Sequence, residues 1–295
     1  MWSALQLARA LRVAALLACA ASTAGCAQES LLTPLNWAAS TTHAERYASI
    51  AYGADPRQTL DLYVPDTMRP APVMVFWHGG SWQNGDKDYY RFVGAALAAR
   101  GFLAVVPNYR LAPQCPFPCF MRDAALAVKW VKDRARAYGG DVGRLYLSGH
   151  SAGGHIALLL GLQPDFLSGV GLAPADLGGI VALAAPTGLE NLRAGSLAGV
   201  FPSSVPDEAF SPIARAAAQA SGAPPMLLLS GTDDAVIDPA DTRKLAAALR
   251  AGGGRVSLAE YPDTGHLGLL LQFSELFGRR DGAPDAAARF VDRLR

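Results

Sequence analysis

The sequence predicts an α/β protein with a mostly parallel, twisted central sheet and helices on both of its faces. Short apolar runs alternate along the chain with segments of helical spacing, which is the pattern of parallel strands joined by helices. Several of the apolar runs are continuous, as in 73–77, and such runs are typical of strands that are covered on both faces. Together the two observations favour one α/β domain.

The expected elements follow from these patterns. We expect strands at 73–77, 102–106, 145–147, 180–184, 226–229 and 256–261, after two strand-like pieces within 50–65. We expect helices at 90–100, 120–138, 153–162, 241–251 and 286–294, several of which end at glycine. The segment 187–222 is too long for an ordinary connection, so we expect an insertion there that caps the site.

The N-terminal residues 1–25 predict an export signal. Arg9 and Arg12 precede a short apolar run at 13–21, which cannot cross a hydrocarbon core of about 30 Å as a helix. The small residues before Cys26 resemble a lipobox, in which Cys26 would be acylated, although Thr23 stands where Leu is usual. Cleavage after a nearby residue such as Ala27, without lipidation, is the alternative. The expected divisions are then a surface segment at 26–48 and a catalytic domain at 49–295.

Composition excludes some classes of protein. With 51% hydrophobic and 17% charged residues, the chain has enough apolar surface to fold. The 26 Lys and Arg nearly balance the 25 Asp and Glu, which argues against a nucleic-acid partner. Cys115 and Cys119 could form a disulfide in an oxidising compartment or remain free thiols, and the spacing leaves both open. No Cys/His spacing indicates a metal site, and no cofactor is expected.

The strongest motif is Gly149-His150-Ser151-Ala152-Gly153, between a predicted strand and a predicted helix. This is Gly-x-Ser-x-Gly in the context that a nucleophilic serine requires. Side chains at 149 and 153 would collide with the neighbouring strand and helix, and the sharp turn lifts Ser151 to the end of the sheet. We therefore predict that Ser151 is a nucleophile.

A serine nucleophile needs donors for an oxyanion, a base and an acid that orients the base. The loop His78-Gly79-Gly80-Ser81-Trp82 follows a buried strand, so we expect the N–H groups of Gly79, Gly80 and Ala152 to bind the oxyanion. Asp234 and His266 follow later strands in the order Ser, Asp, His, which predicts acid and base. Asp233 is the competing acid and Asp238 a third.

Other residues have less specific interpretations. His150 flanks the nucleophile and fits packing better than a role as base. The candidate substrate contacts are Trp82, His150, Phe201 and Leu267. Large apolar side chains such as Trp82, Phe201 and Leu267 are more often found in the core of a protein than in a substrate pocket.

These motifs together resemble the α/β-hydrolase superfamily, in particular its hormone-sensitive-lipase-like and BD-FAE-type esterases. The resemblance covers nearly all of the chain after residue 48. Its matching stretches are Gln58-Thr-Leu-Asp-Leu-Tyr-Val-Pro65, His78–Trp82, Pro107-Asn-Tyr-Arg-Leu-Ala-Pro113, Tyr138-Gly-Gly-Asp141, the turn at Ser151, Gly231–Asp234 and Gly265-His266. Ser81 stands where many of these esterases have a third glycine, and the resulting His-Gly-Gly-x-Trp form is similar to the kynurenine formamidase subgroup.

The resemblance implies a carboxylesterase that cleaves small to medium acyl esters through an acyl-enzyme. The alternatives are an arylformamidase acting on N-formylkynurenine-like amides and a catalytically silent surface binding module. The expected partner is a small-molecule ester, with no nucleic acid and no membrane contact beyond the possible lipid anchor at Cys26. The expected location is the periplasm or the membrane surface, and the sequence does not indicate an oligomeric state.

Overall fold

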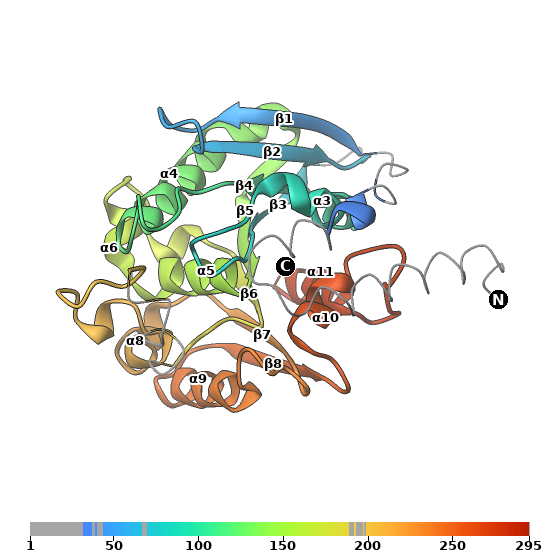
Figure 1. Ribbon diagram of the computed structural model, residues 1–295. Helices are drawn as coiled ribbons and strands as arrows, with labels where there is room; N and C mark the ends of the chain where they lie inside the picture. Colours follow the sequence, from blue (N-terminus) through green and yellow to red (C-terminus); the bar gives the residue numbers. More distant parts are fainter. Residues whose placement is uncertain are drawn as a thin grey trace.

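The sheet is the frame of the structure, a computed structural model that describes residues 32–36, 39, 44–66, 70–188, 192, 197 and 199–294. In this part of the chain, eight strands form one sheet in the order β1-β2-β4-β3-β5-β6-β7-β8 (Figure 1). The strands are β1 (Glu45–Ala51), β2 (Thr59–Val64), β3 (Ala71–Trp77), β4 (Leu103–Pro107), β5 (Gly140–His150), β6 (Gly179–Leu183), β7 (Met226–Gly231) and β8 (Val256–Tyr261).

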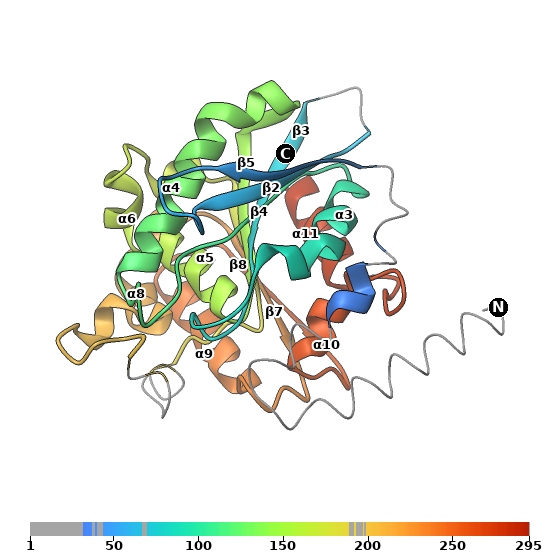
Figure 2. The same ribbon diagram turned by 45° about the horizontal axis from the view of Figure 1, so that its top comes forward.

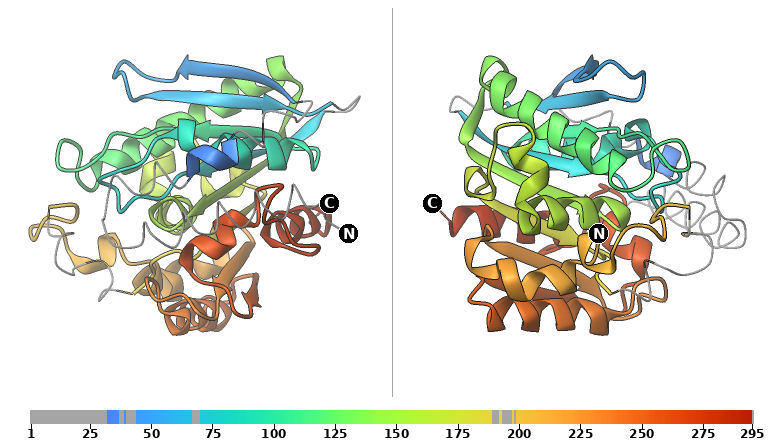
Figure 3. Two further views of the ribbon diagram at one scale, coloured as in Figure 1. Left: turned by 45° about the vertical axis from the view of Figure 1, so that its right-hand side comes forward. Right: turned by 90° about the vertical axis from the view of Figure 1, so that its left-hand side faces the viewer.

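The direction of the strands confirms the predicted fold class. β1 pairs with β2 and β2 with β4 in antiparallel fashion, whereas the other five neighbouring pairs are parallel. The two antiparallel strands β1 and β2 lie at one edge of the sheet, and β8 lies at the opposite edge (Figure 3). Because β3, β5, β6, β7 and β8 are parallel, the loops that follow them all begin at the carboxyl ends of the strands, on the same side of the molecule.

Helices cover both faces of the sheet (Figures 1 and 2). The α-helices are α3 (Arg91–Ala98), α4 (Cys119–Arg134), α5 (Ala152–Leu162), α6 (Pro164–Ser168), α8 (Pro212–Gln219), α9 (Pro239–Ala251), α10 (His266–Leu271) and α11 (Ala283–Asp292). The short 3-10 helices are η2 (Lys87–Tyr90), η3 (Ala135–Tyr138), η4 (Pro174–Asp176), η6 (Asp207–Ala209) and η7 (Ala220–Gly222). Side chains from α4, α5, α8 and α9 join the core on one face, and those from α3, α10 and α11 join the core on the other.

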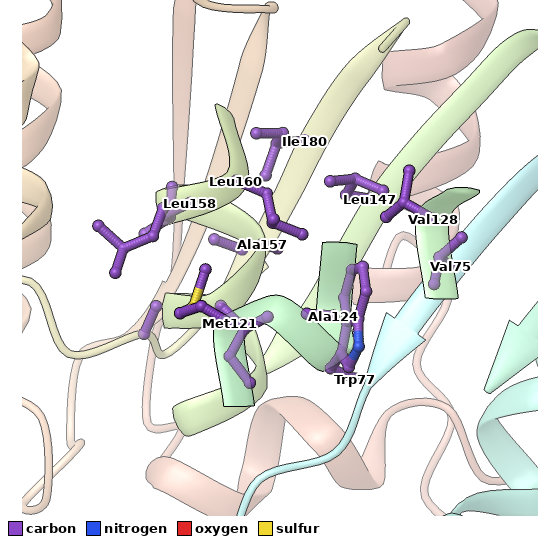
Figure 4. Close-up of a cluster of buried hydrophobic side chains, with 14 of the residues drawn as sticks. Val75, Trp77, Met121, Ala124, Val128, Leu147, Ala157, Leu158, Leu160 and Ile180 are labelled. Carbon is purple, nitrogen blue, oxygen red and sulfur yellow. The ribbon is translucent and has the colours of Figure 1, made fainter. Parts of the chain in front are cut away.

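The two cores follow from the alternation of side chains along a strand. In β3, Val73, Val75 and Trp77 enter one core, whereas Met74 and Phe76 enter the other. Figure 4 shows the first core, where side chains of the parallel strands meet those of α4 and α5. All seven residues of β3 are buried, as the continuous apolar run predicts.

Some boundaries differ from the predicted ones. β1 begins at Glu45, so the sheet includes residues that the prediction assigned to the surface segment 26–48. Leu32 and Leu35 are also buried in the core. β5 starts at Gly140 instead of residue 145, because Ala71 of β3 already pairs with Gly140 where the sequence is polar. The short helices α6 and α10 were not predicted.

The structure also decides one question that the sequence left open. Cys115 and Cys119 form a disulfide, with their sulfur atoms 2.01 Å apart. Cys26 and the signal segment 1–25 lie outside the described residues. None of the helices in the described part of the chain has the length and apolar character that a bilayer crossing requires.

Candidate active site

Ser151 lies in a tight turn between β5 and α5, at the carboxyl end of the parallel strands. Its backbone has φ 53° and ψ −122°, a strained conformation for a residue with a side chain. A Cβ at Gly153 would collide with the carbonyl group of Trp77, and one at Gly149 would collide with the backbone of Gly153. The predicted need for glycine at both positions is therefore confirmed.

Asp234 and His266 are paired on the loops that follow β7 and β8. His266 Nδ1 lies 2.9 Å from Asp234 Oδ2, and the Asp234 side chain is only 1% exposed. The other carboxylate oxygen of Asp234 accepts hydrogen bonds from the amides of Val236 (2.9 Å) and Ile237 (2.8 Å). Burial alone would raise the pKa of Asp234, but the bonds from His266 and from the two amides outweigh it and lower the pKa. The acid is held ionised and fixed in direction.

The two competing carboxylates lie elsewhere. Asp233 is exposed, and its Oδ1 accepts a hydrogen bond from the hydroxyl of Thr232 at 2.9 Å. Asp238 is also exposed and caps α9 by accepting from the amide of Ala240 at 2.8 Å. Of the three acids, Asp234 is the one that the structure brings to His266.

His266 and the serine turn meet through His150, the residue that precedes Ser151. The rings of His150 and His266 have centroids 4.6 Å apart. His150 Nε2 also lies 2.9 Å from the backbone oxygen of His266. Since Asp234 accepts a hydrogen bond from Nδ1–H of His266, the Nε2 of His266 retains a lone pair that can accept a proton.

The loop after β3 lies against this turn. A Cβ on Gly79 would lie 3.2 Å from the Cβ of Ser151 and 3.1 Å from the carbonyl oxygen of His150, so a side chain there would crowd the serine turn. Gly80 has φ +123° and its carbonyl oxygen accepts from the amide of Asn84 at 2.9 Å, which closes the loop. The backbone of this loop therefore lies beside the candidate nucleophile.

One of the three predicted oxyanion donors is already engaged. The amide of Gly79 donates to the hydroxyl oxygen of Tyr90, 3.2 Å away. The set Gly79, Gly80 and Ala152 remains a prediction, and the bond from Gly79 to Tyr90 favours Gly80 and Ala152 as the donors. The contact of Tyr90 was not predicted, because nothing in the local sequence of η2 marks this hydroxyl as a partner of the loop after β3.

The predicted substrate contacts have two different environments. Trp82 and Phe201 are buried and pack against each other, with ring centroids 4.9 Å apart. His150 is also buried, with 1% of its surface exposed. These three side chains therefore lie inside the protein in this conformation. Of the four predicted substrate contacts, only Leu267 is partly exposed.

The insertion is tied to the helix that follows Ser151. His155 Nε2, on α5, lies 2.7 Å from the backbone oxygen of Phe210. The amide of Phe117, inside the disulfide loop, donates to the carbonyl of Val200 at 2.8 Å. Parts of the segment 187–222 thus pack on the same core as the serine turn.

The sheet, the strained serine turn and the loops that follow the strands form an α/β-hydrolase fold, the fold of the superfamily that the sequence resembles. Within that superfamily, residues 60–190 match the family model described as BD-FAE. Among curated proteins, a probable isoprenylcysteine alpha-carbonyl methylesterase of Oryza sativa is 31% identical over 274 residues, covering 83% of this chain and 66% of that protein. Esterase LipC of Mycobacterium tuberculosis is 30% identical over 269 residues, covering 83% of this chain and 64% of that protein.

The chain therefore spans somewhat less than two thirds of the length of these curated relatives. Among solved structures, esterase B from Lactobacillus superimposes with a TM-score of 0.74 at 19% identity, covering 96% of each chain. Esterase 2 of Thermogutta terrifontis, phosphoramylated by tabun, has a TM-score of 0.66 at 27% identity, covering 85% of this chain and 94% of that chain. These likenesses agree with the fold class expected from the sequence.

Proposed function

We propose that the protein is a serine carboxylesterase that cleaves small to medium acyl esters. The observation that carries the proposal is the pairing of Asp234 with His266 beside a strained turn that presents Ser151. The names of the relatives, a methylesterase and an esterase, support the same class of reaction.

In the proposed reaction, Ser151 Oγ attacks the ester carbonyl while His266 Nε2 takes the hydroxyl proton. The amides of Gly80 and Ala152 donate to the oxygen that becomes negative. The proton then passes from His266 to the leaving alcohol, and an acyl-enzyme remains. Water attacks this acyl group with His266 again as base, which releases the acid and restores the Ser151 hydroxyl. Asp234 stabilises the imidazolium and keeps the ring in the correct tautomer.

The test is hydrolysis of p-nitrophenyl acetate and butyrate by the wild-type protein and Ser151→Ala. We expect the variant to lose at least about 10³-fold in kcat with its melting temperature unchanged. Turnover like that of the wild type in Ser151→Ala would contradict the proposal. A panel of acyl chain lengths, with N-formylkynurenine included, then separates the esterase from the arylformamidase. A wild-type protein that neither turns over the panel nor reacts with a fluorophosphonate would instead be a binding module.

We also propose export, with residues 1–25 as the signal and Cys26 as the lipid site. The Cys115–Cys119 disulfide supports an oxidising compartment. Expression of the full chain in a bacterium, followed by cell fractionation, tests the proposal. We expect the wild type in the membrane fraction and Cys26→Ala in the soluble periplasmic fraction. Retention of both in the cytoplasm would contradict export.

A further inference from the structure

His150 joins the serine turn to the backbone of the candidate base. Its Nε2 lies 2.9 Å from the carbonyl oxygen of His266, a residue 116 positions further along the chain. The side chain is 1% exposed, so water does not compete for this contact. His266 is the first residue of α10, and its own side chain is held separately by Asp234. The base is thus held at two points that belong to two different loops.

The contact fixes the protonation of His150. A carbonyl oxygen only accepts hydrogen bonds, so the Nε2 of His150 must carry the hydrogen. Its Nδ1 faces Gly79, where a Cβ would lie 3.2 Å away, and it has no hydrogen-bond partner among the described residues. A second proton on Nδ1 would therefore be buried without an acceptor. Burial, and then the charge of His266, lower the pKa of His150 to about 3.

We propose that His150 is a positioning residue for His266: its neutral Nε2–H anchors the His266 backbone to the turn that carries Ser151. This inference rests on the proposed function, in which His266 takes the Ser151 proton. Asp234 fixes the rotation of the imidazole, and His150 fixes how far the base lies from the nucleophile. Neither contact alone determines both.

The neutrality of His150 suits this role better than a charged donor would. When His266 takes the serine proton it becomes a cation, and its ring centroid is 4.6 Å from that of His150. A lysine or arginine at position 150 would repel that cation. A neutral imidazole supplies the donor without opposing the charge that develops on the base.

The test compares three substitutions of similar size. His150→Gln can place an amide N–H near the position of Nε2, whereas His150→Asn reaches only as far as Nδ1 and His150→Leu has no donor. We expect Leu and Asn to lower kcat for p-nitrophenyl butyrate by about 10- to 100-fold with KM within about twofold. We expect Gln to recover most of the lost kcat, with similar melting temperatures in all three.

Three outcomes would overturn the proposal. One is wild-type kcat in His150→Leu. Another is a higher KM at unchanged kcat, which would make His150 a substrate contact, and the third is a loss that Gln does not relieve better than Asn. A second readout needs no variant: ¹⁵N NMR of the wild-type imidazoles should show His150 as the Nε2–H tautomer between pH 5 and 8. An Nδ1–H tautomer or titration in this range would contradict the anchor even if the protein were not an esterase.

Discussion

The turn around Ser151 and the loops that carry Asp234 and His266 hold their residues by different means. At the serine turn, backbone lies against backbone, and glycines at 149 and 153 leave no room for a Cβ. At Asp234 and His266, side-chain hydrogen bonds hold the geometry: His266 Nδ1 donates to Asp234 Oδ2, and His150 Nε2 donates to the His266 backbone oxygen. The first region should therefore be sensitive to added volume and the second to lost donors and acceptors.

The largest expected effect belongs to the second region. Asp234→Asn keeps the volume of the side chain but favours the wrong tautomer of His266, so we expect kcat to fall by about 10⁴-fold. The matched control, Asp233→Asn, changes an exposed carboxylate that does not contact His266, and we expect a change of less than about threefold. Steady-state kinetics on p-nitrophenyl butyrate decides between them. A larger loss in Asp233→Asn would assign the acid to its neighbour.

Acid should act on the buried histidines and on the Asp234–His266 pair at different pH values. Burial lowers the pKa of His78 and His155 to about 4 and, together with the charge of His266, that of His150 to about 3, from an ordinary value of 6.5. Between pH 6.5 and 4, the unfolded chain thus binds up to three protons that the folded chain does not. The free energy of unfolding should fall as the pH falls, by up to about 4 kcal/mol per pH unit.

The Asp234 pair acts at lower pH. The pKa of Asp234 in the folded protein is lowered below its ordinary value of 3.8. The stabilising contribution of the ionised carboxylate is therefore complete above pH 3.8 and is lost as the pH falls through the folded-state pKa. Urea unfolding at pH 7, 6 and 5 measures the histidine part. His155→Gln, which can still donate to Phe210, should reduce the pH slope by about one third. A stability that does not change between pH 7 and 5 would contradict the neutral buried histidines.

Added volume tests the serine turn. The Cβ in Gly153→Ala would collide with the carbonyl of Trp77, so we expect a loss of about 3 kcal/mol in the free energy of unfolding and a large fall in kcat. Gly222→Ala is the control, because a Cβ there has no atom within 4 Å. Urea denaturation with kinetics on the same samples gives both values. Equal effects at the two positions would show that the turn is not close-packed.

The smallest expected effect comes from the disulfide. Replacing both Cys115 and Cys119 by serine removes a cross-link that closes a short loop, which should cost about 2 kcal/mol of stability. Because Phe117 in this loop donates to Val200 of the insertion, kcat should change more than for a remote pair of substitutions. Thermal unfolding of the double variant measures the effect. A variant as stable as the wild type would mean that the cross-link contributes nothing.

The sequence predicts the serine turn better than it predicts the rest of the site, and the reason is locality. Gly149, Ser151 and Gly153 lie within five residues between a strand and a helix, so their roles follow from local geometry. Tyr90 contacts Gly79 across 11 positions and His150 contacts His266 across 116. The pattern of apolar residues along the sequence does not predict such contacts, because they depend on how the loops pack in the folded protein.

The same limit explains the other differences. Large aromatic residues such as Trp82 and Phe201 occur both in substrate pockets and in protein cores. Only the packing in the structure shows that these two lie in the core. β1 is an edge strand with mostly exposed residues, so its sequence lacks the apolar alternation that predicts a strand. The strands β3 to β8 were predicted because each contains a run of apolar residues, whereas the position of β4 between β2 and β3 was not predicted.

The most direct measurement of the central claim is the position of a covalent adduct. The purified protein is incubated with a fluorophosphonate, digested, and its peptides are mapped by mass spectrometry. We predict one adduct per chain, on Ser151, with formation slowed at least about 10³-fold in His266→Ala, since the base that activates the serine is lost. An adduct on another residue, or none on a folded protein, would contradict the assignment of Ser151 as the nucleophile.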